Sequence, residues 1–266
     1  MALSRVTAYG EWRQKPVGAI PVLTDLRSPE ARALVDSVLQ RGGGWLTPDE
    51  TQGLMTAVGV KTATARMTRS ADEAVVAASA IGFPVALKAV GPLILHKTER
   101  QAVRLNLDSA KAVHQAAVDF DERFRGELTG LFVQQMVTGG VEMLVGALHD
   151  PTFGAIVVCG SGGVLVDLLA DSAFRIHPLT TEDAVEMIDE VRGARLLRGY
   201  RGAPPADEAA LRDVVLRVSA LLSICPEIQE LDLNPVKVFA SGACAIDVRV
   251  RVERLVPTRR ARRVEY

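Results

Sequence analysis

Oxygen-bearing side chains recur at every second position in the segment Glu-Leu-Asp-Leu-Asn-Pro, near the C-terminus. They belong to Glu230, Asp232 and Asn234, and a strand would place all three on one face because its side chains alternate between faces. Asp247 follows in a second strand-like segment. Carboxylate and amide oxygens are ligands that Mg²⁺ accepts. The pattern therefore indicates a cation site, although an acidic alternation alone is equally typical of a solvated strand face.

The two strand-like segments are separated by a turn signal at Ser241-Gly242. A two-residue turn there places Asn234 opposite Arg249 and leaves Asp247 diagonal to Asn234 on the same face. Diagonal neighbours lie roughly 7 Å apart, which is close enough for two oxygen ligands to converge on one cation. Pro235 predicts either an edge strand or a β-bulge, because proline has no N–H to donate to a neighbouring strand.

Two basic residues upstream are candidates for phosphate chemistry. Lys88 stands in Pro-Val-Ala-Leu-Lys-Ala-Val, where every other residue is apolar. Such a lysine either lies at a strand edge or points at a fixed anion such as a nucleotide phosphate. His96, in Leu-His-Lys-Thr-Glu, has the chemistry of a nucleophile toward phosphorus, although a lone loop histidine is more often polar surface.

Two further segments offer groups that suit a nucleotide. Gln134 ends an apolar strand and Glu142 opens the next one. Their amide and carboxylate groups could hydrogen-bond a purine and a ribose. Gly162 and Gly163, in Gly-Ser-Gly-Gly, would offer unhindered backbone N–H groups to an anion, and a plain tight turn explains them equally well.

The overall composition excludes several classes of protein. The chain has 266 residues, 48% of them hydrophobic, and its net charge of -1 provides no field to attract nucleic acid or a membrane surface. No run approaches the length of about 18 apolar residues that a membrane helix needs. Cys159, Cys225 and Cys244 are odd in number and widely spaced, which argues for a reducing compartment. We therefore expect a cytoplasmic protein that binds neither nucleic acid nor membrane.

Strands and short helices alternate along the chain in an order that predicts an α+β fold with largely antiparallel sheets. Capping signals at Thr47 and Ser70 each open a helix. Strands 131–137 and 141–149 read as a hairpin over Thr-Gly-Gly. The remaining expected elements are strands 84–90, 102–107 and 155–159, and helices 28–40, 109–124, 181–192 and 206–223.

In these blocks the sequence resembles the ATP-grasp module of NDP-forming acyl-CoA synthetases. That family includes the β subunit of ADP-forming acetyl-CoA synthetase and, more distantly, that of succinate–CoA ligase. The resemblance covers about residues 45–252 and rests on five blocks in the family's order. They are Gly-Phe-Pro-Val-Ala-Leu-Lys at 82–88, Leu-His-Lys-Thr-Glu at 95–99, Val-Gln-Gln-Met-Val-Thr-Gly-Gly-Val-Glu at 133–142, Asp-Pro-Thr-Phe-Gly at 150–154 with Gly-Ser-Gly-Gly at 160–163, and Glu-Leu-Asp-Leu-Asn-Pro at 230–235 with Asp247.

The resemblance implies a two-lobed ATP-grasp fold, and the residues before and after it complete a domain division. Residues 1–44 would be a linker or docking arm, and 45–256 the ATP-grasp domain. Its small lobe would span about 60–129 and its large lobe about 130–256. Residues 257–266 would be a basic tail.

The resemblance also implies roles for individual residues. The expected nucleotide contacts are Lys88 for the phosphates, Gln134 and the backbone near Val137 for the adenine edge, Glu142 for the ribose, and Gly162 and Gly163 in the glycine turn. Asn234 and Asp247 match Mg²⁺ ligands.

His96 stands where the family has a relay histidine that becomes phosphorylated, and Asp232 matches the acid that orients a phosphohistidine. Arg100, Gln101 and Ala102 depart from the two glycines that usually follow this block.

The implied reaction interconverts acyl-CoA, ADP and phosphate with carboxylate, CoA and ATP by way of phosphohistidine. ATP or ADP and Mg²⁺ would bind this chain. CoA and the first catalytic histidine would belong to an α-type partner subunit, in a heterotetramer. Two alternatives stay open: a non-catalytic nucleotide-binding regulatory or scaffolding module, and a stand-alone ATP-dependent carboxylate ligase.

Overall fold

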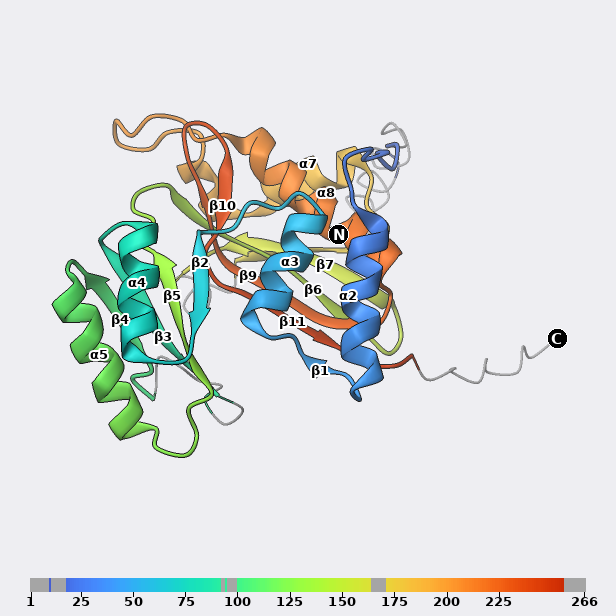
Figure 1. The fold of residues 1–266 in the computed structure, drawn as a ribbon. Helices are drawn as coiled ribbons and strands as arrows, with labels where there is room; N and C mark the ends of the chain where they lie inside the picture. Colours follow the sequence, from blue (N-terminus) through green and yellow to red (C-terminus); the bar gives the residue numbers. More distant parts are fainter. Residues whose placement is uncertain (1–9, 11–17, 92–93, 95–99, 164–170, 256–266) are drawn as a thin grey trace.

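A computed structural model describes residues 10, 18–91, 94, 100–163 and 171–255. Two sheets organise the chain (Figure 1): one of seven strands in the order β1-β11-β9-β6-β7-β8 with β10 beside β9, and one of four strands in the order β2-β5-β3-β4. Every pair of neighbouring strands is antiparallel, which confirms the expected α+β class. The strands are β1 (Gly44–Trp45), β2 (Ala65–Thr68), β3 (Val85–Val90), β4 (Val103–Leu107), β5 (Gly130–Gln135), β6 (Val141–Asp150), β7 (Gly154–Ser161), β8 (Ser172–Ile176), β9 (Ile228–Val238), β10 (Ala243–Ala245) and β11 (Val248–Val252).

The four-stranded sheet and two helices form the small lobe, on the left in Figure 1. Helices α4 (Ala71–Ile81) and α5 (Ala110–Arg123) share one apolar core with alternate residues of β3 and β5, among them Leu87 and Val133. The intervening residues, including Lys88 and Gln134, therefore face away from that core. This alternation aims both side chains at the rest of the molecule.

Four helices cover one face of the seven-stranded sheet: α2 (Ser28–Gln40), α3 (Pro48–Ala57), α7 (Thr181–Glu190) and α8 (Glu208–Ile224). A short 3₁₀ helix, η1 (Arg192–Leu196), joins the same core. The strands contribute alternate residues to this core, such as Val145, Leu231 and Leu233. Asp232 and Asn234 consequently lie on the opposite face of the sheet. Among the described helices, none is long and apolar enough to cross a membrane.

Local capping signals locate several helix starts. The Thr47 side chain accepts a hydrogen bond from the Glu50 N–H and the Glu50 carboxylate reaches back to the Thr47 N–H, so the predicted start of α3 is confirmed. Ser70 caps α4 with its side chain, which accepts from the Glu73 N–H, while the Glu73 carboxylate accepts from the Arg69 N–H and not from Ser70. Such caps replace hydrogen bonds that the first turn of a helix lacks.

Two expectations about chain organisation differ from the structure. Helix α2 is not part of a separate arm, because Ala31, Val35 and Val38 are fully buried in the core of the large lobe. The predicted hairpin of β5 with β6 is wrong: β5 pairs with β2 and β3, whereas β6 pairs with β7 and β9. Strand β5 therefore belongs to the small lobe. The chain enters the large lobe after Gln135, and the predicted lobe boundary at residue 130 lies too early. Local sequence signals carried no information on which sheet each strand would join.

Candidate functional site

The two lobes meet at consecutive residues between β10 and β11. The Gln134 side-chain amide donates to the backbone oxygen of Ile246 at 2.7 Å. Next to it, the Lys88 ammonium lies 3.4 Å from an Asp247 carboxylate oxygen. Lys88 and Gln134 are buried, with 8% and 4% of their surfaces exposed, while the Asp247 side chain is 37% exposed. These two contacts form the seam between the lobes. They bring the buried Lys88 ammonium next to the partly exposed Asp247 carboxylate.

The hairpin that carries Asn234 has a different register from the one predicted. Val238 pairs with Ala243, so residues 239–242 form the turn. Arg249 pairs with Asp232, and the Asn234 N–H donates to the Asp247 carbonyl at 3.0 Å. Asn234 and Asp247 thus lie directly opposite each other. The expected diagonal arrangement is wrong, and the observed one brings the two proposed ligands closer together.

A register shift at Asn234 and Pro235 confirms the bulge that the proline predicted. Met143 of β6 pairs with Val236 and Val145 pairs with Leu233, so two residues of β9 lie opposite one residue of β6. Because β9 lies between β6 and β11, the alternative of an edge strand is excluded. The extra residue also reverses which positions face the core: Leu233 and Val236 are both fully buried.

This reversal explains why the period-2 pattern of the sequence did not place Lys237 on the same face as Asp232 and Asn234. Beyond the bulge, odd-numbered residues face away from the core, and the Lys237 ammonium lies 3.4 Å from a Glu142 carboxylate oxygen. Glu142 is exposed at the start of β6, and Val137 is half-buried in the link from β5. A bulge inferred from Pro235 would have predicted the change of face, and so the position of Lys237.

Asp232 occupies an electrostatically unfavourable position for a carboxylate. Partial burial raises its pKa, and the nearby carboxylates of Asp247 and Glu230 raise it further. Arg249, its partner across the strand pair, opposes these effects. A carboxyl group held in this way exchanges protons closer to neutrality than an ordinary aspartic acid, which suits a group that orients a titrating partner.

The glycine turn after β7 contacts Asn234. The Gly162 N–H donates to the Glu142 carbonyl and the Gly163 N–H donates to the Asn234 amide oxygen, both at 3.0 Å. These two N–H groups are therefore not free to receive an anion in this structure. The Gly163 bond orients the Asn234 amide, whereas the Gly162 bond holds the turn against the start of β6.

The pair Asn234 and Asp247 has the chemistry of a magnesium site. Both supply hard oxygen ligands, and Mg²⁺ in nucleotide sites needs only one or two protein ligands, because phosphate oxygens and water complete its shell. Within the described part of the chain, no group of three or more His, Cys, Asp and Glu residues could hold a metal by itself. The donors present thus fit a metal that arrives with a nucleotide. His96, the predicted relay residue, lies outside the described residues.

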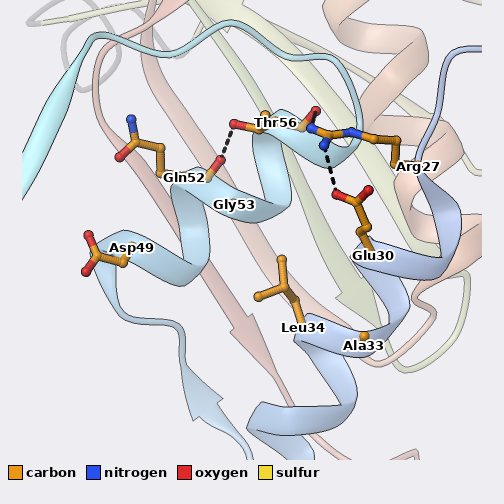
Figure 2. A pocket seen from close by; sticks show the side chains of 8 residues that line it. All are labelled: Arg27, Glu30, Ala33, Leu34, Asp49, Gln52, Gly53 and Thr56. Atoms are coloured by element: carbon orange, nitrogen blue, oxygen red, sulfur yellow. Dashed lines mark hydrogen bonds and ion pairs between the residues drawn. The ribbon is translucent and has the colours of Figure 1, made fainter.

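A separate hollow of about 660 Å³ lies between α2 and α3 (Figure 2). Some of its polar groups have partners: Arg27 forms an ion pair with Glu30 at 2.9 Å, and the Thr56 hydroxyl donates to the Gln52 carbonyl at 2.8 Å. None of its lining residues belongs to the predicted site. They are Arg27, Glu30, Ala33, Leu34, Asp49, Gln52, Gly53 and Thr56.

Comparison with known proteins places these features in a family. A family model described as the ATP-grasp domain matches residues 37–252. Acetate–CoA ligase [ADP-forming] I of Archaeoglobus fulgidus is 41% identical over 83% of this chain, which spans 33% of that protein. Acetate–CoA ligase [ADP-forming] II subunit beta of Pyrococcus furiosus is 35% identical over 84% of this chain and 97% of its own length.

Solved structures agree with the observed fold. The acetyl-coenzyme A synthetase 1 of Candidatus Korarchaeum cryptofilum, in complex with coenzyme A and Ca-AMPCP, superposes with a TM-score of 0.80 at 36% identity. The match covers 84% of this chain and 100% of that one. Another structure of that synthetase contains Mg-AMPPCP and a phosphohistidine segment that points towards the nucleotide-binding site; its TM-score is 0.74 at 35% identity. The two-lobed ATP-grasp fold inferred from the sequence is confirmed.

Proposed function

The chain belongs to the ATP-grasp domain family, and we propose that it is the nucleotide-binding subunit or domain of an ADP-forming acid–CoA ligase. The observation that carries this proposal is the convergence of Lys88, Asn234 and Asp247 at the seam between the lobes. ADP and ATP would bind there, with Lys88 facing the phosphates. Relatives named as acetate and 4-hydroxybutyrate ligases support the reaction class.

The fixed charges of the site suit phosphoryl transfer. Lys88 is buried and its ammonium is paired with Asp247, so it would offer a positive charge to the phosphates once Asp247 binds the metal. Asn234 and Asp247 would hold Mg²⁺, which supplies charge neutralisation on the phosphates when it is bound. Glu142, next to the link between the lobes, would accept hydrogen bonds from the ribose. Gln134 and the backbone near Val137 would form the adenine edge.

The proposed chemistry passes a phosphoryl group through histidine. In the direction of ATP synthesis, the N–P bond of phosphorylated His96 would break as an O–P bond to ADP forms, and the ring would leave as neutral imidazole because its other nitrogen carries a proton. Asp232, whose pKa is raised by burial and by neighbouring carboxylates, would hold the phosphorylated imidazole in position. In the opposite direction, His96 accepts the γ-phosphoryl group of ATP.

The lengths of the relatives support a partner subunit. This chain spans nearly all of a subunit beta and about a third of a single-chain ligase, so its relatives act together with further polypeptide. We assign CoA binding and the first catalytic histidine to an α-type partner subunit, in a heterotetramer. The acyl group would be chosen there.

Labelling with γ-labelled ATP tests the proposal. The purified chain with Mg²⁺ should acquire acid-labile, base-stable label, as a phosphohistidine does, and Lys88→Met should not. Lys111→Met, an exposed lysine on α5, is the matched control and should be labelled like the wild type. A wild-type chain that binds ATP yet stays unlabelled, both alone and with a CoA-binding subunit, would favour the non-catalytic nucleotide-binding module.

A further inference from the structure

Asp171, directly before β8, is a buried carboxylate with 8% of its surface exposed. One of its oxygens accepts hydrogen bonds from the Ser161 hydroxyl at 2.6 Å and the Gly193 N–H at 2.8 Å, and the other accepts from the Arg192 N–H at 2.9 Å. Burial alone would raise the pKa of this group, but the donors outweigh it and lower the pKa to about 2. Asp171 is therefore an ionised anchor at any ordinary pH.

The surroundings of this anchor are too tightly packed to move independently. A Cβ atom on Gly193 would lie 2.1 Å from the Ser161 hydroxyl oxygen, and one on Gly162 would lie 2.6 Å from the backbone of Met143. Both distances are shorter than real Cβ atoms show. Ser161 also donates its backbone N–H to the Asp171 carbonyl at 3.0 Å, so the end of β7 is held by two bonds to one residue.

A continuous set of contacts leads from this anchor to the proposed metal site. Ser161 is followed by the glycine turn, whose Gly163 N–H donates to the Asn234 amide oxygen at 3.0 Å. An amide oxygen has two lone pairs, so it can accept this bond and still face a cation. The direction in which Asn234 presents its oxygen thus depends on where the turn lies.

We propose that Asp171 is a positioning residue: it fixes Ser161 and the glycine turn, and through Gly163 it sets the orientation of Asn234. It does not touch the nucleotide. This inference rests on the proposed function, because it takes Asn234 as a ligand of the nucleotide-bound metal. Asp171 would thus affect metal binding without contacting Asn234, because the glycine turn connects the two residues.

A double-mutant cycle tests the inference through the affinity for Mg·ADP, measured by titration calorimetry. Asp171→Asn should weaken Mg·ADP binding about threefold to tenfold in the otherwise wild-type chain, and should have no further effect in an Asn234→Ala background, because residues that act through one group are not additive. Binding of ADP without Mg²⁺ should not change. Ser161→Ala removes only the hydroxyl and should show the same pattern in a chain that folds.

Asp207 provides the matched control. Its carboxylate accepts from the Gly242 and Ala210 N–H groups at 2.8 and 3.0 Å and caps α8, but it does not contact the glycine turn. Asp207→Asn should therefore leave Mg·ADP affinity unchanged. Equal losses from Asp171→Asn in both backgrounds, or no loss in either, would overturn the inference. If Asn234→Ala alone leaves the affinity unchanged, the metal assignment in the proposed function fails, and the inference fails with it.

Discussion

The Lys88 ammonium lies 3.4 Å from the Asp247 carboxylate, so the proposed phosphate-binding cation and the proposed metal ligand neutralise each other across the two lobes. Without nucleotide, each charge offsets the desolvation of the other. When Mg²⁺ and phosphates are bound, Asp247 can turn to the metal and Lys88 to the phosphates. Asp247 should therefore favour nucleotide binding when Mg²⁺ is present and oppose it when the metal is absent, because it then competes with the phosphates for Lys88.

Asp247→Asn separates these effects. We expect Mg·ADP to bind at least about tenfold more weakly, because a charged ligand is lost. ADP in the presence of a chelator should bind as well as to the wild type or more tightly, since Lys88 is released from its partner. Calorimetric titrations with Mg²⁺ and with chelator measure both affinities. Equal losses under the two conditions would assign Asp247 a role in the fold and remove it from the metal site.

Gln134 forms a hydrogen bond between the lobes that was not predicted from the sequence. Its buried amide donates across the seam to Ile246, so Gln134→Leu should lower the free energy of unfolding by about 1–3 kcal/mol. Thermal or urea denaturation measures this loss, and ADP affinity should fall by less than Lys88→Met reduces it. Gln135→Leu changes the exposed neighbour and should leave stability unaltered. Unchanged stability in Gln134→Leu together with lost ADP binding would assign the residue to the adenine edge alone.

These contacts show what the sequence could and could not predict. Capping at Thr47 and Ser70 was predictable because the partners lie three residues away. The bulge at Pro235 was predictable because proline lacks a donor. The contact of Gln134 with Ile246 joins residues 112 apart, and no local pattern encodes it. The predicted register of the terminal hairpin was wrong because the turn has four residues, 239–242, whereas Ser241-Gly242 suggested a turn of two residues.

The raised pKa of Asp232 predicts a dependence of stability on pH. A folded pKa above the unfolded value of about 3.9 means that the folded state binds the proton more tightly, so stability falls as pH rises through the interval between the two values. Asp232→Asn cannot ionise, and it should be more stable than the wild type at pH 7. This difference should disappear below about pH 4, where the wild-type carboxyl is protonated in both states.

Urea denaturation of both proteins from pH 3 to pH 8 measures the Asp232 effect. Asp72→Asn, at a carboxylate with 95% of its side chain accessible, is the control and should not be more stable than the wild type at pH 7. A variant that is less stable than the wild type at pH 7 would mean that Arg249 stabilises the ionised carboxylate by more than burial and the neighbouring carboxylates destabilise it.

His96 is the residue on which the proposed relay depends. A relay is needed because the acyl phosphate would form on the partner subunit, away from the nucleotide, so a histidine must carry the phosphoryl group to ADP. His96→Ala should abolish ATP formation in the complex with that partner and should remove acid-labile label from this chain. ADP affinity should change little, since the proposed role of the imidazole is to carry the phosphoryl group and not to bind the base, the ribose or the metal. Rapid-quench labelling and calorimetry on the same preparation measure the two effects.

The residues that follow the His96 block differ from those of the family, so activity of His96→Ala would also be informative. Arg100, Gln101 and Ala102 replace the two glycines that usually follow this block in the family. Arg100 is held by the Glu127 carboxylate at 2.7 Å, a contact that two glycines could not make. If His96→Ala retains near-normal turnover with the partner, the partner's own histidine reaches the nucleotide directly. The relay would then not operate in this chain. Arg100→Gly, which removes the ion pair with Glu127, would test whether that pair prevents it and should leave ADP affinity unaltered.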